Sequence, residues 1–199
     1  PQMIKLHHAG VLSRLVIEMS EMPCSGDAFS IKTWVDRLYR QFTDRHFSIL
    51  RPDGTAYGHA TSIWALIDTQ TRQPADLEKL PNGGFSDTLI PNEPSPIPTM
   101  GRMRMKSPTL VNTHKAAYSD LDINGHVNSI RYIELLLDFF DANELKAHPV
   151  RRIEMAYCLE SYCGDELQIY HDIDAKNDKR HLFEIRKDES IIVKGSIEF

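Results

Sequence analysis

The chain reads Tyr118-Ser-Asp-Leu-Asp-Ile-Asn-Gly-His-Val-Asn-Ser-Ile-Arg-Tyr132 just ahead of an apolar helical pattern. Asp122, Asn124 and His126 alternate in it, so their side chains point the same way in an extended or turning backbone. Gly125 is expected where the chain turns sharply or a ligand approaches the backbone. The following helix would present free N–H groups and a positive dipole end, which suits a developing oxyanion. This stretch therefore predicts a polar site at a helix N-terminus.

Two other interpretations fit part of this stretch. Residues 120–125 reproduce the opening of an EF-hand calcium loop, but the twelfth position, which should be a bidentate Glu, is Arg131. We therefore expect no metal ion. The second alternative is a turn rich in Asp and Asn that only caps a helix. His126 favours a site, because histidine as a residue type can exchange a proton near neutral pH and a cap needs no such group.

The segment after the motif has the pattern of a buried helix running from about Val127 to Asp141. Its apolar residues at helical spacing are Ile130, Ile133, Leu136, Leu137 and Phe140. The nearly unbroken apolar run over 135–140 suggests burial on more than one side. A short strand is expected before the motif, at Thr109–His114. A long apolar helix wrapped by antiparallel strands is therefore predicted for this half of the chain.

The chain contains an internal repeat at an offset of 138 residues. Gly26-Asp27 falls on Gly164-Asp165, and each pair joins two strand-like segments. Two further apolar strands follow in each half, at 45–50 and 60–66 and again at 181–186 and 190–199. The repeat predicts two similar units.

The two units are not equally complete. Residues 109–152 precede the Ile153 strand of the second unit, whereas only residues 1–14 precede the matching strand of the first. We therefore expect the first unit to lack its opening strand and central helix, and the chain to lack an N-terminal segment. Seven of the eleven prolines fall between Thr71 and Pro108, a composition typical of a linker. The predicted organisation is an incomplete unit over 1–70, a linker over 71–108 and a unit over 109–199 that holds the motif.

Composition excludes several classes of protein. Hydrophobic residues make up 41% and charged residues 26% of the chain, which is ordinary for a soluble globular protein. No apolar run approaches the length of a membrane span, and the first residues show no signal-peptide pattern. The net charge of −5 argues against general nucleic-acid binding. Three cysteines without metal spacing fit reduced thiols, so a cytoplasmic protein is expected.

The motif resembles the signature of the acyl-ACP thioesterases, enzymes that release fatty acids from acyl carrier protein. A second block, 152–166, resembles the strand that holds the family's functional Glu, which falls on Glu160. The first half is also similar, at Thr33-Trp-Val, at the 60–68 strand and at Thr71-Arg-Gln-Pro. The resemblance implies an α+β fold, a tandem (double) hotdog in which antiparallel sheets wrap a long central helix, with the first hotdog incomplete. Plant members have a Cys directly after the Glu, whereas Ser161 follows here, so a Cys nucleophile is not available at that place.

The resemblance also implies site residues. The catalytic set is Asp122, Asn124, His126 and Glu160, and the substrate-binding set is Gly125, Val127 and Asn128. We expect backbone N–H groups near 125–128 to polarise the thioester carbonyl, and His126 with Glu160 to activate water. Asn124 would position the thioester or the water, and Asp122 would orient its neighbours or act as the nucleophile. Direct water attack and a covalent Asp intermediate both stay open. In the repeat Glu160 falls on Met22, so one site per chain is expected.

The implied activity is hydrolysis of the thioester of fatty acyl-ACP, which ends fatty acid synthesis and needs no cofactor. The implied partner is acyl carrier protein with its phosphopantetheine-linked acyl chain. This partner is acidic, so a basic docking surface is expected. The candidate clusters are Arg102, Arg104 and Lys106, and Arg131, Arg151 and Arg152. The alternatives are an acyl-CoA thioesterase, a hydroxyacyl dehydratase of the same fold, or a non-catalytic acyl-binding fragment. A homodimer also stays open.

Overall fold

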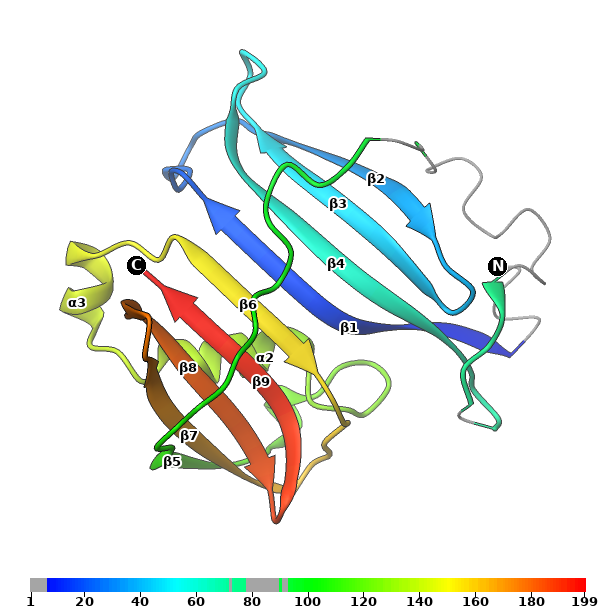
Figure 1. Ribbon diagram of the computed structural model, residues 1–199, viewed down its shortest axis with the longest axis vertical. Coiled ribbons are helices and arrows are strands. Elements are labelled where there is room, and N and C mark those ends of the chain that lie inside the picture. Colours follow the sequence, from blue (N-terminus) through cyan, green and yellow to red (C-terminus); the bar gives the residue numbers. More distant parts are fainter. Residues whose placement is uncertain (1–6, 72, 78–89, 91–92) are drawn as a thin grey trace. The chain divides into compact units, whose positions relative to one another are not determined.

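The computed structural model describes residues 7–71, 73–77, 90 and 93–199 (Figure 1). The chain divides into two compact units, Pro1–Met100 (unit 1) and Gly101–Phe199 (unit 2). Unit 1 contains strands β1 (His8–Met19), β2 (Ser30–Leu38), β3 (Phe42–Leu50) and β4 (Ala56–Asp68). Unit 2 contains β5 (Thr109–Lys115), a 3-10 turn η3 (Tyr118–Asp120), α2 (Ser129–Leu137), α3 (Ala142–Ala147), β6 (Arg152–Tyr157), β7 (Glu166–Asp174), β8 (Asn177–Lys187) and β9 (Ser190–Glu198).

The predicted repeat is confirmed by the strand order within each unit. Unit 1 has the antiparallel order β2-β3-β4-β1, and unit 2 has β7-β8-β9-β6 with β5 added beside β7. Matching strands therefore occupy matching places. The glycines that were aligned at the first turn of each unit, Gly26 and Gly164, have φ of 96° and 90°. Both turns need this left-handed backbone, which glycine adopts without a steric penalty.

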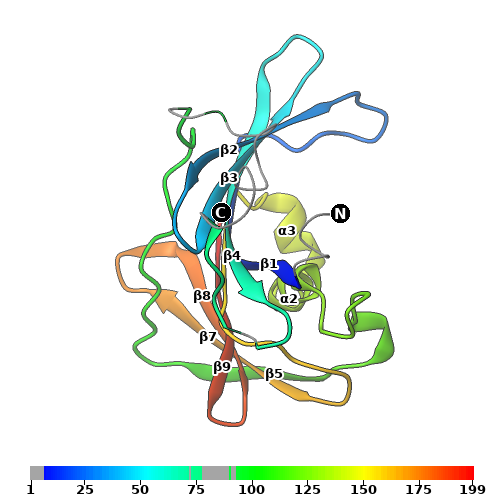
Figure 2. The same cartoon turned by 90° about the vertical axis from the view of Figure 1, so that its right-hand side faces the viewer.

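The core of unit 2 lies between α2 and one face of its sheet. Alternation along the strands puts Phe183 and Ile185 of β8 on the same face as Val193 and Gly195 of β9. Leu136 of α2 is fully buried against this face, and Gly195 lets the helix approach closely. In Figures 1 and 2 the two helices of unit 2 lie on one side of its strands.

The opposite face of this sheet holds a buried ion cluster. Glu154 is 2% exposed, and its carboxylate accepts hydrogen bonds from Arg152 Nε at 2.9 Å, Arg180 Nη2 at 2.6 Å and the Gly101 amide at 3.1 Å. Burial alone would raise the pKa of Glu154, but these donors outweigh it and hold the pKa below its ordinary value. The cluster fixes residue 101 of the connecting segment to unit 2.

The prediction of one long central helix over residues 127–141 is wrong. The helix α2 has nine residues and ends at Leu137, and α3 is separate from it. Beyond α2, the amides of Phe139 and Phe140 donate three residues back, which tightens the backbone out of the α-helix. Asp141 then caps α3 by accepting from the Asn143 amide. Because the apolar spacing continues through this break, the sequence pattern overestimated the length of the helix.

The predicted linker over 71–108 lies only partly within the described residues. Positions 72, 78–89 and 91–92 are outside them, and residues 93–108 form neither helix nor strand. The division at 71 and 108 therefore stays a prediction. Within the described residues, no helix is both long enough and apolar enough to span a membrane. The three cysteines are exposed.

Candidate active site

The start of the motif is tied down by a buried carboxylate. Asp120 is 4% exposed and accepts from the Ala117 amide at 2.7 Å and from Arg131 Nε at 2.8 Å, and its Oδ2 lies 2.7 Å from His114 Nε2. Burial would raise the pKa of Asp120, but the Ala117 amide and His114 outweigh it and lower the pKa. Asp120 thus joins β5, η3 and α2. Among the described residues there is no group of three or more His, Cys, Asp or Glu that could hold a metal ion.

Asp122 organises the loop that follows. Its Oδ1 accepts from the amides of Asn124 at 2.8 Å and His126 at 3.1 Å, and its own amide donates to the His126 carbonyl at 2.7 Å. Gly125 closes the turn with φ of 80°. Burial would raise the pKa of Asp122, but the hydrogen bonds from His126 and Asn124 outweigh it and lower the pKa. Asp122 is therefore an ionised anchor of the loop.

The loop brings His126 to Glu160. The distance from His126 Nε2 to Glu160 Oε2 is 3.5 Å, and the two side chains are 25% and 26% exposed. The juxtaposition comes from backbone pairing, because the Val127 amide donates to the Ser161 carbonyl at 2.9 Å and His126 forms a β-bridge with Tyr162. An imidazole and a carboxylate thus meet at a position that solvent can reach.

Asn124 lies at the exposed side of the same loop. The side-chain Nδ2 of Asn124 is 3.4 Å from Asp122 Oδ2, and the backbone amide of Asn124 donates to Asp122 Oδ1. The loop therefore brings the side chains of Asp122 and Asn124 together, and it presents the Asn124 carboxamide to solvent.

The amides expected to polarise a carbonyl are already engaged in this conformation. Those of Gly125, Val127 and Asn128 donate to the carbonyls of Asp122, Ser161 and Asp120, respectively. The substrate-binding role of these residues stays a prediction. In this conformation their backbone N–H groups are not available to bind the substrate. At the helix start, Asn128 caps the Ile130 amide at 2.9 Å, and no acceptor for the amide of Ser129 is found in the described part of the chain.

Sequence reasoning missed Ser129, Tyr132 and Tyr162 at this site. The Tyr132 hydroxyl lies 2.6 Å from Ser161 Oγ, and this pair is buried beneath the loop. Tyr162 contacts both His126 and Glu160. Ser129 could have been recognised as the first helical residue after an Asn cap. Tyr132 and Tyr162 lie in the two blocks described above, but no spacing in the sequence indicates that they contact Ser161, His126 and Glu160.

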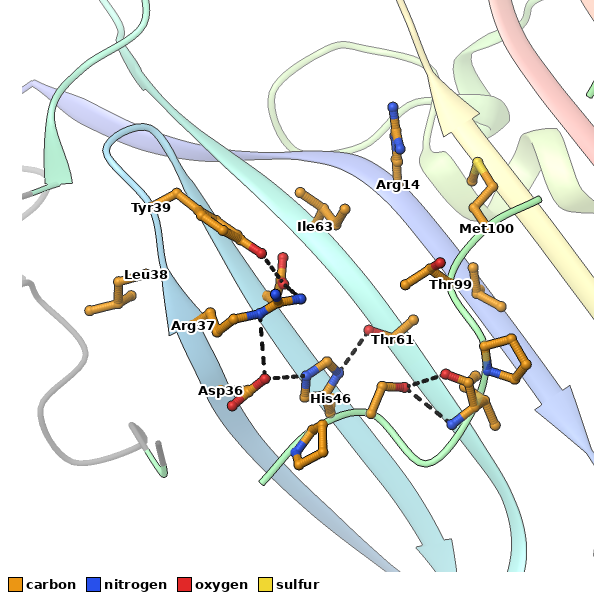
Figure 3. Close-up of a pocket in the computed structure, with 16 residues that line it drawn as sticks. Arg14, Asp36, Arg37, Leu38, Tyr39, His46, Thr61, Ile63, Thr99 and Met100 are labelled. Atoms are coloured by element: carbon orange, nitrogen blue, oxygen red, sulfur yellow. Dashed lines mark hydrogen bonds and ion pairs between the residues drawn. The ribbon is translucent and has the colours of Figure 1, made fainter. Parts of the chain in front are cut away.

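A cavity of about 1020 Å³ lies in unit 1 and contains none of the predicted site residues (Figure 3). His46 is 3% exposed there, with Nδ1 at 2.7 Å from Thr61 Oγ1 and Nε2 at 3.8 Å from Asp36 Oδ2. Burial lowers the pKa of His46, so its neutral form is favoured. Arg37 Nη2 pairs with Asp44 at 2.9 Å. This cavity has a mixed apolar and polar lining in unit 1 and is not part of the His126 site.

Solved structures similar to this chain have a tandem hotdog-like thioesterase fold. An acyl-ACP thioesterase from Bacteroides thetaiotaomicron is 42% identical with a TM-score of 0.89, covering 99% of this chain and 79% of that one. The 12:0-ACP thioesterase from Umbellularia californica has a TM-score of 0.82 at 18% identity, covering 98% of this chain and 77% of that one. At this identity the second likeness concerns the fold alone. The tandem hotdog-like fold is thus shown, without the long central helix.

Sequence comparisons agree. Oleoyl-acyl carrier protein thioesterase 1 of Arabidopsis thaliana is 30% identical over 176 residues, covering 82% of this chain and 48% of that protein. The chain spans about half the length of the curated relatives it matches. The family model described as the acyl-ACP thioesterase N-terminal domain matches residues 2–80, and that of the C-terminal domain matches residues 104–199. The chain therefore belongs to the acyl-ACP thioesterase family.

Proposed function

We propose that this protein hydrolyses the thioester of fatty acyl-ACP, which releases a free fatty acid and ends fatty acid synthesis. The observation that carries the proposal is the pair of His126 Nε2 and Glu160 Oε2, 3.5 Å apart beside the N-terminus of α2, in a chain of this family. Both side chains are about a quarter exposed, so water and substrate can reach them. An imidazole beside a carboxylate is suited to take a proton from water.

The contacts of Asp122 favour direct attack by water over a covalent intermediate. Its Oδ1 already accepts two backbone amides, and its lowered pKa means that the anion is stabilised and less basic. In our proposal Asp122 keeps the loop in shape and His126 removes the proton from water while Glu160 holds the imidazole. Asn124, exposed on the same loop, positions the water or the thioester.

A donor is needed for the oxygen that becomes negative when water adds to the thioester. The amide of Ser129 fits this role, because it is the first amide of α2 and the helix dipole is positive at this end. This assignment moves the expected oxyanion interaction from residues 125–128 to the next residue of the chain.

Unit 2 has exposed apolar side chains near the motif that suit an acyl chain, and elsewhere it has a basic cluster that suits an acidic carrier. Large apolar side chains exposed near the motif and near Glu160 are Tyr118, Ile123, Ile130, Leu159 and Tyr162. Arg102, Arg104 and Lys106 are exposed at alternate positions, and they form the basic cluster that we propose contacts the carrier protein. The second predicted cluster suits this role less well, because Arg131 pairs with Asp120 and Glu134.

The test is hydrolysis of acyl-ACPs of several chain lengths, followed by mass spectrometry of the released fatty acid. His126→Ala should lower kcat by about 10²- to 10⁴-fold, the range for loss of a general base. His148→Ala is the matched control, since His148 is exposed at the end of α3 and should leave kcat unchanged. The assay is run on the 199-residue chain and on a version extended at its N-terminus.

Three other outcomes would replace or refute the proposed function. Faster hydrolysis of acyl-CoA than of acyl-ACP would make the protein a CoA thioesterase. Binding of acyl-ACP without hydrolysis in either version would leave an acyl-binding protein. Full activity of the His126→Ala variant would refute the proposed site.

A further inference from the structure

We infer that Tyr162 is a positioning residue that holds Glu160 against His126, an inference that rests on the proposed function of this pair. The Tyr162 hydroxyl donates to Glu160 Oε2 at 3.1 Å, and this is the same oxygen that faces His126 Nε2 at 3.5 Å. The Tyr162 ring also meets the imidazole edge to face, with centroids 5.2 Å apart and planes at 73°. One side chain therefore contacts both members of the proposed water-activating pair.

Hydrogen bonds hold the backbone of Tyr162, which sets the position from which its side chain reaches Glu160. Its amide donates to Asp165 Oδ2 at 2.9 Å, and Asp165 Oδ1 pairs with Lys187 Nζ at 2.7 Å. The preceding residue, Ser161, is fully buried and accepts from the Val127 amide. Ordered supporting contacts of this kind reduce the freedom that a catalytic pair would otherwise lose at the moment of reaction.

The phenol has two expected effects on Glu160. A hydrogen bond to a carboxylate favours its charged form, so Glu160 stays ionised at lower pH than it would without the phenol. It also restrains Oε2 on the side that faces His126. Other titratable groups close to this region are Asp122, Tyr132 and the Asp165–Lys187 pair, and none of the substitutions below changes them.

The test compares Tyr162→Phe with the parent protein in the acyl-ACP assay across pH. Phe keeps the ring against His126 and removes the donor. We expect kcat to fall about fivefold with KM unchanged, the loss typical of one hydrogen bond. The acid limb of kcat against pH should move to higher pH. Tyr170→Phe is the matched control, because the Tyr170 hydroxyl donates to Gln168 Oε1 at 3.4 Å on β7, outside the proposed site, and its loss should change neither quantity.

A second background separates positioning from a general structural effect. If Tyr162 acts through Glu160, then Tyr162→Phe should cost nothing further in a Glu160→Gln protein. Carbon NMR of the Glu160 carboxyl gives a readout that does not depend on activity, and Tyr162→Phe should raise the pH at which this carboxyl titrates. An unchanged acid limb and an unchanged carboxyl titration would overturn the inference, even if His126→Ala abolishes activity. Full activity of both His126→Ala and Glu160→Gln would instead refute the proposed function, and the NMR titration would still decide the Tyr162 contact.

Discussion

Helix α2 packs closely against the sheet of unit 2 at Gly195. A larger residue at this position should lower the stability of the protein. A Cβ at residue 195 would lie 2.4 Å from Leu136 Cδ1 and 3.1 Å from Met155 Sδ. Carbon atoms in contact are normally about 3.5–4.0 Å apart, so the first distance is about 1 Å too short. Leu136 and Met155 are fully buried and have little room to move.

We therefore expect Gly195→Ala to lower the free energy of unfolding by about 1–3 kcal/mol, the usual cost of overpacking a core. For a chain of this size the melting temperature should fall by about 2–4 °C for each kcal/mol. Urea unfolding followed by circular dichroism measures the change. The control is Gly10→Ala in β1, whose added Cβ would lie 3.8 Å from Trp64 Cε3 and should be neutral or slightly stabilising.

A double-mutant cycle identifies the contact responsible. Leu136→Ala alone should cost about 2–5 kcal/mol, because it leaves a cavity. In that background the clashing methyl is gone, so Gly195→Ala should cost much less than in the parent. The reasoning would be refuted if Gly195→Ala lost no more stability than Gly10→Ala, or if it lost the same amount in both backgrounds.

Two further predictions concern charge. Glu154→Ala should destabilise the protein by about 3–5 kcal/mol in urea unfolding, because it removes the buried carboxylate that the largely buried Arg152 and Arg180 share, although Arg180 keeps its ion pair with Asp174. Glu134→Ala, in an exposed pair, should cost about 0–1 kcal/mol, and equal losses would contradict this account. His171 Nε2 and His181 Nδ1 lie 2.9 Å apart, and burial lowers the pKa of each imidazole below 6.5. Below pH 6.5 the unfolded chain therefore binds more protons than the folded protein. The contribution of the two neutral histidines to folding stability is complete above pH 6.5 and is lost as pH falls through their lowered pKa values. A double variant with Phe at both positions should lose less stability between pH 7 and 5, and an unchanged pH slope would count against the pair.

Local features of the chain predicted much of the fold. Strand alternation and the paired Gly-Asp turns predicted the repeat, because a turn with positive φ and a strand with one buried face each leave a mark in neighbouring residues. The same reasoning failed for the helix. Apolar spacing continued to Phe140, although Asp141, a good helix cap, was visible as a start signal for α3.

The candidate site was predictable in its residue types but not in its contacts. Asp122, Asn124 and His126 are neighbours in sequence, so their grouping follows from the chain itself. Glu160 could be proposed only from the family resemblance. That the amides of Val127 and Asn128 donate to Ser161 and Asp120 could not be read from any spacing.

The sequence by itself determined the repeated succession of strands in the two units, the polar motif and the family to which the chain belongs. Only the tertiary structure decided that His126 meets Glu160, that Tyr162 contacts both, and that the amides at 125–128 are already engaged. The physical reason is that periodicity and turn chemistry act between near neighbours in the chain. Hydrogen bonds between the loop and the segment after β6 depend instead on how distant parts of the chain pack.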